Sequence, residues 1–402
     1  MLTSITLENF KSFRKATVPL GPFTLLVGTN ASGKSNLRDA LRFVHGIGRG
    51  YSLTEIIGEK WGEGGELQWK GIRGGTSEAV FGDGEEFSIE TEIRLRVRFR
   101  PGVSSQAYRH RITVAIEREK LGPRVTAESL YAGSLMYFDS NPVDDPPKQQ
   151  DEEHLLVRLP RGGAHRRSNP VLMLLSSSPA IVQLPRKLRM ATKARRSMGE
   201  TVMQWNMGDL LRSMTSMRFL DLSPEATRLP SLPGRQVLGD RGENLSSVLQ
   251  MICEDSSRKS SLLEWIKALT PLDVVDFDFP KDFSGRVLVH LVEKSGRKIS
   301  AHSASDGTLR FLAMLAALLG ADGARFYFFE ELENGIHPTR LHLLVQLIEQ
   351  QCRTGRVQVV ATTHSPQLLG FLNPASRQDA LLMYRLKDAD DSRVRRIIEL
   401  PR

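Results

Sequence analysis

The stretch GTNASGKS, residues 28–35, limits what this chain can fold into more than any other feature of its sequence. It has the spacing G-x-x-x-x-G-K-S, in which the glycines let backbone N–H groups curl around an anionic oxygen. In this pattern Lys34 reaches the outer phosphates of a nucleotide, and the hydroxyl of Ser35 can bind Mg²⁺. The apolar stretch at 23–28 predicts a strand before the loop, and the pattern from 33 to 44 predicts a helix after it. Strand, glycine-rich loop and helix are the context that a phosphate-binding loop requires.

Composition narrows the class of protein. With 402 residues, of which 40% are hydrophobic, the chain can bury at least one sizeable core. Its net charge of +9 favours contact with polyanions such as nucleic acid, although a basic chain can also simply be well solvated. The two cysteines, Cys253 and Cys352, match neither a disulfide framework nor a zinc motif, which is typical of the reducing cytoplasm. The longest uncharged apolar stretches, 171–184 and 311–320, fall short of the roughly 20 residues that a membrane crossing needs, so we expect a cytoplasmic protein without a membrane partner.

Two alternating segments predict an antiparallel β lobe. Residues 89–99 and 110–119 alternate apolar and polar side chains, which indicates two strands with one buried face each. The buried faces are expected to carry Ile93, Leu95, Val97, Ile112, Val114 and Ile116. The other face of the first strand carries Arg94, Arg96 and Arg98, which more often form a solvated face than a phosphate-binding stripe.

A basic segment follows an acidic, proline-rich linker at 139–153. Between residues 154 and 199 there are ten cations and no aspartate or glutamate. A block of this kind can neutralise phosphates and release counterions, which gives it a salt-sensitive affinity for DNA or RNA. The alternative is a mobile basic loop without a partner, and the sequence leaves both interpretations open. The ten residues are Arg158, Arg161, Arg166, Arg167, Arg186, Lys187, Arg189, Lys193, Arg195 and Arg196.

Two buried strands in the C-terminal half end in reactive side chains. The apolar run ARFYFFEE ends in Glu330 and Glu331, and VQVVATTHSP carries His364 at its polar end. Because strands alternate with helices here, the sequence predicts a largely parallel sheet, and ligands of such sheets bind at the carboxyl ends of the strands. An apolar strand with a terminal acid fits a Walker-B element that holds Mg²⁺. We therefore assign Glu330 to the metal, Glu331 to orienting or deprotonating an attacking water, and His364 to a γ-phosphate contact.

One further helix start has the sequence Ser305, Asp306, Gly307. Serine or aspartate at this position is an ordinary N-cap, and that alone accounts for the local structure. Helix N-termini with free N–H groups also bind phosphates. The order along the chain is a phosphate loop, an S-D-G-T helix start, a strand with two glutamates and a strand with T-H, which is hard to attribute to chance.

Together these motifs resemble the ABC-type ATPase heads of RecF and SMC proteins, and more closely the small bacterial RecF-like ATPases of the AAA family. The resemblance rests on LENFKSF (7–13), GTNASGKS, SASDGT (303–308), FYFFEELENGIHP (326–338) and TTHSP (362–366), and it covers both ends of the chain better than the middle. It implies an α/β fold, a P-loop NTPase of the ABC-ATPase head type. Such a fold would have a mainly parallel sheet core, an antiparallel β lobe and an inserted helical or irregular segment.

The resemblance also implies cofactors and a partner. ATP and Mg²⁺ would be sandwiched between two heads, so hydrolysis would require a homodimer. Ser305 and Gly307 of one subunit would complete the site of the other, and residues 333–337 would cross the dimer interface. Carried over from the family, the nucleotide contacts are Gly28, Asn30, Ala31, Ser32, Gly33, Lys34, Ser35, Asn36, Ser305 and Gly307, the metal ligands are Ser35 and Glu330, and the catalytic residues are Lys34, Glu331 and His364.

Two positions depart from the family pattern. Ala304 stands where the signature usually begins with leucine, and Glu330 stands where the metal residue is usually aspartate. Neither change removes a needed group, although the longer glutamate side chain would alter the metal shell. The family's glutamine loop has two candidate positions, Gln68 and the segment 221–224.

We expect residues 1–135 and 221–402 to form the two halves of the ATPase head, with 136–220 as a basic insertion. The favoured function is an ATP-driven switch that acts on DNA, in repair or in defence against phage. The alternative is a nucleotide-gated scaffold or sensor that controls a separate effector protein such as a nuclease. LENFKSF and the basic insertion argue against the ATP-driving subunit of a transporter, and the short stretch after His364 argues against an appended nuclease domain.

Overall fold

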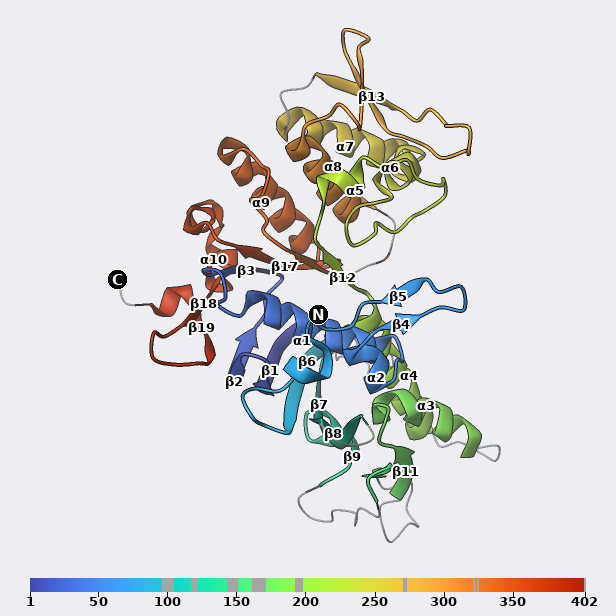
Figure 1. Ribbon diagram of the computed structural model, residues 1–402, viewed down its shortest axis with the longest axis vertical. Helices are drawn as coiled ribbons and strands as arrows, with labels where there is room; N and C mark the ends of the chain where they lie inside the picture. Colours follow the sequence, from blue (N-terminus) through green and yellow to red (C-terminus); the bar gives the residue numbers. More distant parts are fainter. Residues whose placement is uncertain are drawn as a thin grey trace. The chain divides into compact units, whose positions relative to one another are not determined.

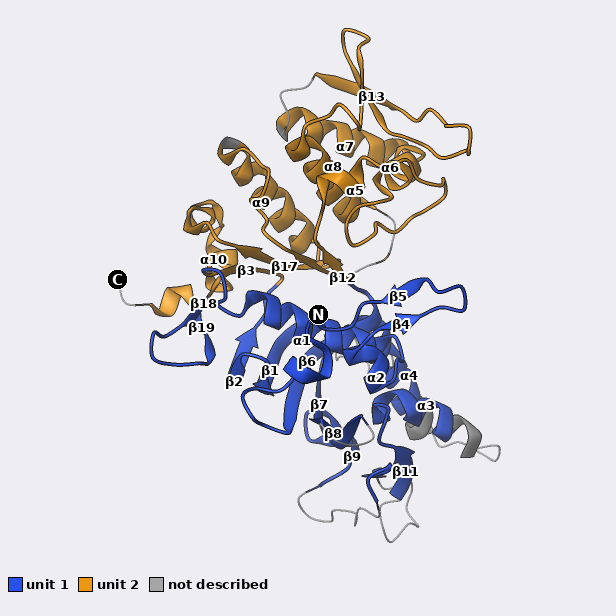
Figure 2. Cartoon of the chain, viewed as in Figure 1, with its two compact units in different colours: residues 1–21, 29–217, 383–395 blue, residues 22–28, 218–382, 396–402 orange. Residues whose placement is uncertain are grey.

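A computed structural model describes residues 1–95, 105–116, 122–142, 151–160, 171–191, 198–269, 273–320, 323 and 325–400 (Figure 1). The chain has two compact units (Figure 2). Unit 1 comprises residues 1–21, 29–217 and 383–395, and unit 2 comprises 22–28, 218–382 and 396–402. The boundaries of these units differ from those of the three segments predicted from the sequence. The three-segment division stays a prediction.

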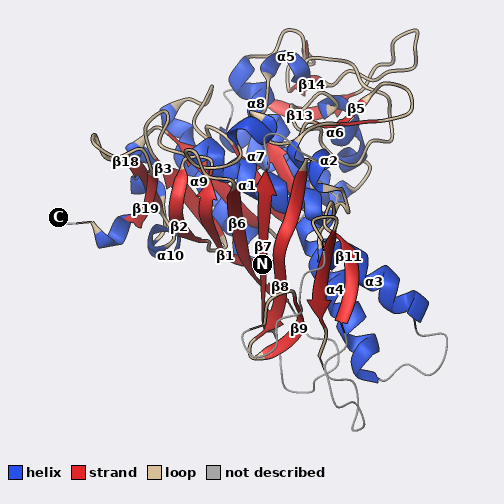
Figure 3. Cartoon of the chain, turned by 60° about the horizontal axis from the view of Figure 1, so that its bottom comes forward, coloured by secondary structure: helices blue, strands red, loops and turns tan. Residues whose placement is uncertain are grey.

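An eight-stranded antiparallel sheet forms most of unit 1, and its strands are the long red arrows of Figure 3. The spatial order is β11-β10-β9-β8-β7-β6-β1-β2. The strands are β1 (Leu2–Phe10), β2 (Phe13–Pro19), β6 (Glu86–Leu95), β7 (Gln106–Ile116), β8 (Pro123–Ala132), β9 (Leu135–Asp139), β10 (His154–Arg158) and β11 (Val171–Leu175). This confirms the expected antiparallel lobe, and strands continue into the stretch expected to be helical or irregular.

The predicted strand pair is β6 and β7, which run antiparallel with Ile89 opposite Ile112. Four side chains of the expected inner faces are buried, namely Ile93, Ile112, Val114 and Ile116, while Leu95 is half-buried. Arg94 is exposed, as expected of the outer face. Val97, Arg96 and Arg98 lie outside the described residues.

Helices and a small hairpin accompany this sheet in unit 1. They are α1 (Lys34–Gly48), α2 (Leu53–Ile57), α3 (Ala180–Ala191) and α4 (Met198–Thr215), with β4 (Lys60–Trp61), β5 (Leu67–Trp69) and the 3₁₀ turn η1 (Gly75–Glu78). Helix α1 packs on the sheet through Phe43, whose ring meets that of Phe87 edge to face. It crosses α4 closely at Gly48, where a Cβ atom would lie 2.6 Å from the backbone nitrogen of Thr215. The Thr215 hydroxyl donates to the Gly48 carbonyl across this crossing.

The second sheet has six strands in the order β12-β16-β17-β3-β18-β19. They are β12 (Met217–Leu220), β16 (Phe326–Phe329), β17 (Gln358–Thr363), β3 (Phe23–Val27), β18 (Leu381–Arg385) and β19 (Ser392–Arg396). The pairs β16–β17, β17–β3 and β3–β18 are parallel, and every residue of β3, β16 and β17 is buried. Strands covered on both faces read as continuous apolar runs, which is why these were recognisable in the sequence.

Helices and a small antiparallel sheet pack around the parallel strands in unit 2. The helices are α5 (Pro224–Thr227), α6 (Leu245–Cys253), α7 (Ser256–Leu269), α8 (Asp306–Leu319), α9 (Pro338–Arg353) and α10 (Pro374–Gln378), with 3₁₀ turns η2 (Pro366–Phe371) and η3 (Ile397–Glu399), and the sheet is β13 (Val274–Asp278), β14 (His290–Glu293) and β15 (Lys298–Ser300). Helix α8 is buried along almost its whole length. The expected α/β class, a parallel core with an antiparallel lobe, is confirmed. Within the described part of the chain, no helix is both long and apolar enough to cross a lipid bilayer.

Candidate active site

Three parallel strands of unit 2 bring predicted site residues to one edge of the sheet. β16 leads into Glu330 and Glu331, β17 leads into His364, and β3 leads into Gly28. Phe329 pairs with Ala361, and Thr363 pairs with Val27, so the carboxyl ends of the three strands are neighbours. Backbone bonds continue past the strands, because Leu332 N–H donates to Thr362 and Gly28 N–H donates to Thr363.

Glu331 has an unusual backbone conformation at this edge. Its φ of 47° lies in the left-handed region, which residues other than glycine rarely adopt. Its N–H donates to the Thr362 hydroxyl at 2.9 Å, and its carboxylate Oε2 accepts from the amide of Asn334 at 3.2 Å. The other carboxylate oxygen lies 3.8 Å from Nε2 of His364. The Glu331 side chain is half exposed and lies beside the His364 imidazole. This exposure suits a group that must contact a water molecule.

The loop after Glu331 is tied to the start of the next loop. The backbone N–H of His364 donates to Oε1 of Glu333 at 2.7 Å. The backbone N–H of Glu330 donates to Leu220 at the end of β12, which fixes the other side of the glutamate pair. Sequence reasoning placed Glu333 and Asn334 only in the segment expected to cross a dimer interface, and it gave Thr362 no role. All three lie inside the motifs that carry the family resemblance. Their closeness in sequence to Glu331 and His364 was therefore the signal that could have identified them.

The phosphate loop continues from Gly28 into unit 1. Gly33, with φ of 105°, precedes α1, and Ala31 has φ of 61°. The ammonium group of Lys34 donates to the Thr29 carbonyl at 2.8 Å, and this hydrogen bond joins the two ends of the loop. The Ser32 hydroxyl is buried and has no hydrogen-bond partner among the residues that the structure describes. A buried hydroxyl in that state suits an incoming phosphate oxygen, because leaving it unpaired costs free energy.

The remaining predicted residues of the loop lie at the start of α1. Asn30 is exposed, and Ser35 and Asn36 are half-buried. The amide of Asn36 donates to the Ser12 hydroxyl at 2.7 Å, and its carbonyl oxygen accepts from Arg73 at 3.1 Å. The LENFKSF motif thus contacts the helix of the phosphate loop within unit 1.

Ser305 and Gly307 lie at the start of α8 in unit 2. Ser305 is the N-cap, and its hydroxyl accepts from the backbone N–H of Thr308 at 3.2 Å. A Cβ atom on Gly307 would lie 2.2 Å from the carbonyl oxygen of Gly335, so only glycine fits against that loop. Arg228 donates to Asp306 and to the Ala304 carbonyl on either side of Ser305. Contacts within unit 2 therefore account for a serine at 305 and a glycine at 307. The contact of these two residues with a second subunit stays a prediction.

Four members of the predicted basic segment fall within described elements. Arg158 is in β10, and Arg186, Lys187 and Arg189 are in α3. Lys187 donates to the carbonyl of Met173 on β11. The other six cations, Arg161, Arg166, Arg167, Lys193, Arg195 and Arg196, lie outside the described residues.

Two family models match the chain. Residues 222–370 match the model described as "AAA domain, putative AbiEii toxin, Type IV TA system", and residues 1–99 match the one described as "AAA ATPase domain". Over 47 residues the chain is 55% identical to the Chromosome partition protein Smc of Methanocaldococcus jannaschii, which is 11% of this chain and 4% of that protein. Over 77 residues it is 32% identical to an ATP/GTP phosphatase of Helicobacter pylori, which is 18% of this chain and 20% of that protein. The chain thus spans only a small part of the length of both curated relatives.

Among solved structures the chain is similar to an SMC head bound to the C-winged helix domain of ScpA. The TM-score is 0.50 with 13% sequence identity, over 98% of this chain and 96% of that chain. At this level of identity the likeness concerns the fold alone, and it spans nearly the whole chain.

Proposed function

We propose that the chain carries an ATPase head of the SMC and RecF type and that it hydrolyses ATP with Mg²⁺ at a site completed by a second copy. The observation that carries the proposal is the shared edge of β16, β17 and β3, where the glutamate pair, His364 and the start of the phosphate loop follow neighbouring strands. Ligands of parallel sheets bind at such an edge. The family matches support the coarser statement, that the chain is an ATPase.

The donor set fits the proposed cofactors. Mg²⁺ is usually held by one or two carboxylates together with substrate phosphates, and in P-loop NTPases also by a Ser or Thr hydroxyl of the loop, so Glu330 and Ser35 are side chains of the types that it takes. Among the described residues no cluster of three or more His, Cys, Asp or Glu side chains could hold a metal ion. Bound Mg²⁺ would neutralise charge that develops on the phosphates.

The residues of the chain would then act as follows. Lys34 and the N–H groups of the loop bind the phosphates. Further nucleotide contacts come from Asn30, Ala31, Ser32 and Asn36. Glu331 orients the attacking water and takes its proton, while His364 contacts the γ-phosphate and steadies the carboxylate of Glu331. Ser305 and Gly307 of the partner subunit would close the site. We expect slow turnover that requires self-association.

The variant Glu331→Gln tests this assignment. It keeps the shape of the side chain but cannot accept a proton, so nucleotide binding should persist while hydrolysis falls by at least about 10²-fold. An ATP-bound dimer should accumulate on a sizing column. Glu264→Gln, on the exposed face of α7, is the matched control and should behave as wild type. Unchanged turnover in Glu331→Gln would show that another group activates the water.

For the role in the cell we propose an ATP-driven action on DNA, in repair or phage defence. The excess of cations between residues 154 and 199 supports it. DNA binding should weaken steeply with salt and disappear when Arg186, Lys187 and Arg189 are changed to glutamate. The alternative is control of a separate effector protein, which is supported by the toxin–antitoxin description of one family model and by a head of this fold that binds ScpA. Retention of a protein partner after the charge reversal, without DNA binding, would favour the alternative.

A further inference from the structure

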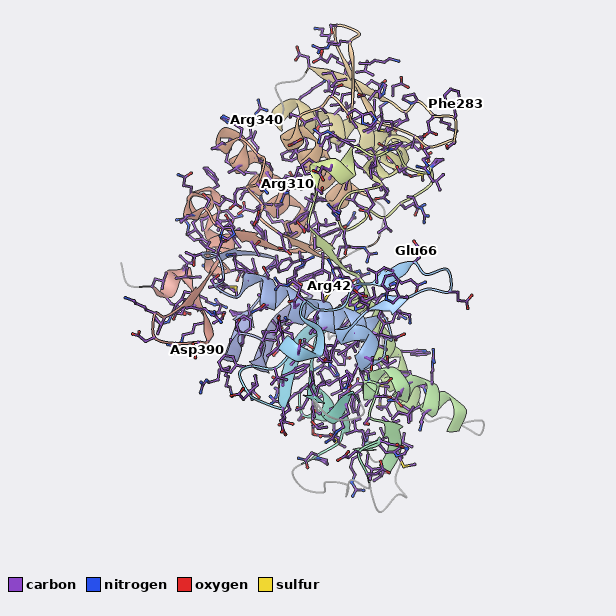
Figure 4. The ribbon with its side chains drawn as sticks, in the orientation of Figure 1. Arg42, Glu66, Phe283, Arg310, Arg340 and Asp390 are labelled. Atoms are coloured by element: carbon purple, nitrogen blue, oxygen red, sulfur yellow. The ribbon has the colours of Figure 1, made fainter. Side chains whose placement is uncertain are left out.

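We propose that Arg310 is a positioning residue that holds the backbone of Glu330 and Glu331 in place and links it to the start of α8. This inference rests on the proposed hydrolysis site. Arg310, which is labelled in Figure 4, belongs to the first half of α8. Its exposed fraction is 5%. One nitrogen of its guanidinium, Nη2, donates to the carbonyls of Glu330 at 2.8 Å and of Glu331 at 3.0 Å. The other, Nη1, donates to the carbonyl of Leu222 at 2.8 Å.

The burial of this cation needs a reason. Removing a guanidinium from water carries a large desolvation penalty, which a leucine at this position of the helix would avoid. Burial lowers the pKa of Arg310, and the nearby carboxylates of Asp221, Glu331, Glu333 and Glu330 oppose the change. The charge therefore lies among acids at the predicted metal end of the sheet. Its hydrogen bonds, however, go to the backbone carbonyls of Leu222, Glu330 and Glu331.

These hydrogen bonds stabilise the backbone conformation of Glu331. Its left-handed backbone is strained, so it persists only where neighbouring groups hold it. The peptide group before Glu331 is held from both sides, because Thr362 accepts from its N–H and Arg310 donates to the Glu330 carbonyl. The peptide group after it is held by Arg310 through the Glu331 carbonyl. Arg310 thereby fixes the direction in which the Glu331 carboxylate leaves the strand.

The same arginine joins Glu331 to the helix start that bears Ser305 and Gly307. The α8 segment fits tightly against the loop after Glu331, since a Cβ on Gly307 would meet the Gly335 carbonyl. A ligand or partner that moves the first turn of α8 would thus also move the guanidinium, and with it the carbonyls of Glu330 and Glu331. Contact at Ser305 would thereby be coupled to the orientation of the group that activates water.

The test compares Arg310→Met and Arg310→Lys with Tyr327→Phe. The Tyr327 hydroxyl donates to the Ala317 carbonyl at 2.7 Å, so it joins the same two elements, β16 and α8, through a helix carbonyl instead of the carbonyls of Glu330 and Glu331. For Arg310→Met we expect kcat to fall about 10- to 100-fold, the penalty for a misplaced catalytic group, with the Kd for ATP changed by less than about threefold. Arg310→Lys should recover part of kcat, because its ammonium can still donate to one or two carbonyls. Tyr327→Phe should lower the melting temperature yet keep kcat.

Amide hydrogen exchange of residues 326–337 provides a readout that does not depend on turnover. In both Arg310 variants it should speed up around Glu331, and in Tyr327→Phe it should not. Equal kcat values in Arg310→Met and Tyr327→Phe, or unchanged exchange in both Arg310 variants, would overturn the inference. Absence of ATP hydrolysis by the wild-type protein would instead refute the proposed function, while the exchange measurement would still decide whether Arg310 holds this segment.

Discussion

Nε2 of His364 lies 3.8 Å from Oε1 of Glu331, and both side chains are partly exposed at the carboxyl edge of the parallel strands. A weak contact of this length can tighten when a substrate arrives, because catalytic hydrogen bonds are often long before it binds. We expect His364→Ala to lower kcat by about 10²-fold while ATP binding stays near that of wild type. Single-turnover hydrolysis and nucleotide titration measure the two quantities. His290→Ala, in β14, is the control, and a large loss of ATP affinity in His364→Ala would show that the imidazole serves binding rather than hydrolysis.

Gly33 is expected to tolerate no side chain. A Cβ atom there would lie 2.5 Å from Oγ and 2.8 Å from Cβ of Ser392, and its φ of 105° is strained for any other residue. Gly33→Ala should therefore lower the free energy of unfolding by about 1–3 kcal/mol and weaken ATP binding. Chemical denaturation and nucleotide titration measure both effects. In the double variant with Ser392→Gly the steric part should be relieved and the backbone strain should remain, so complete recovery would contradict this account.

The parallel core and its reactive strand ends could be predicted because their signals are local. The buried strand β16 is a continuous apolar run, β17 has the apolar centre VVA, and Glu330 and His364 directly follow these two strands. The end of the antiparallel sheet was harder to predict. In β11, an edge strand, Val171, Met173 and Leu175 are exposed although their run looks like a core strand. A short apolar run does not by itself say which face is covered.

Individual side-chain contacts between segments far apart in the chain could not be predicted from one sequence. Ser392 donates to the Ser12 hydroxyl from 380 residues away, and Arg310 reaches carbonyls at Leu222 and Glu331. An arginine that bonds backbone carbonyls leaves no pattern at the positions it contacts, because any residue supplies a carbonyl. The helix start at Ser305 was visible, whereas the role of the arginine five positions later required the folded chain.

Glu128 is expected to be a key residue for the stability of unit 1. Its buried carboxylate accepts from His110 Nε2 at 2.9 Å and from the backbone N–H groups of Ala180 and Ile181 at the start of α3. Glu128→Ala would leave these donors buried and unpaired, at about 1–3 kcal/mol each before relaxation. We therefore expect a loss of at least about 2 kcal/mol in urea denaturation. Glu86→Gln, at the exposed start of β6, should change stability little, and an equal effect of the two variants would contradict the assignment.

The ion pair between Lys259 of α7 and Asp276 of β13 should make a pH-dependent contribution in unit 2. The two groups are 2.6 Å apart, and their hydrogen bond lowers the pKa of Asp276 and raises that of Lys259. A carboxylate with a lowered pKa stabilises the fold above its unfolded value, near pH 4, and loses that contribution as the pH falls through the folded value. An ammonium with a raised pKa stabilises below its unfolded value, near pH 10, and loses that contribution as the pH rises through the folded value.

The contribution of this pair should therefore be complete between about pH 5 and pH 9 and decline on both sides. Because Asp276 is half exposed, solvent screens the pair, and we expect only about 0.5 kcal/mol. Urea denaturation of Lys259→Met, Asp276→Asn and the double variant, at pH 3, 7 and 11, measures the coupling free energy between the two side chains. A coupling that is as large at pH 3 as at pH 7 would show that packing of the lysine stem, rather than charge, joins α7 to β13. High salt should reduce the coupling at pH 7, because exposed charges are screened over a Debye length of about 3 Å at 1 M ionic strength.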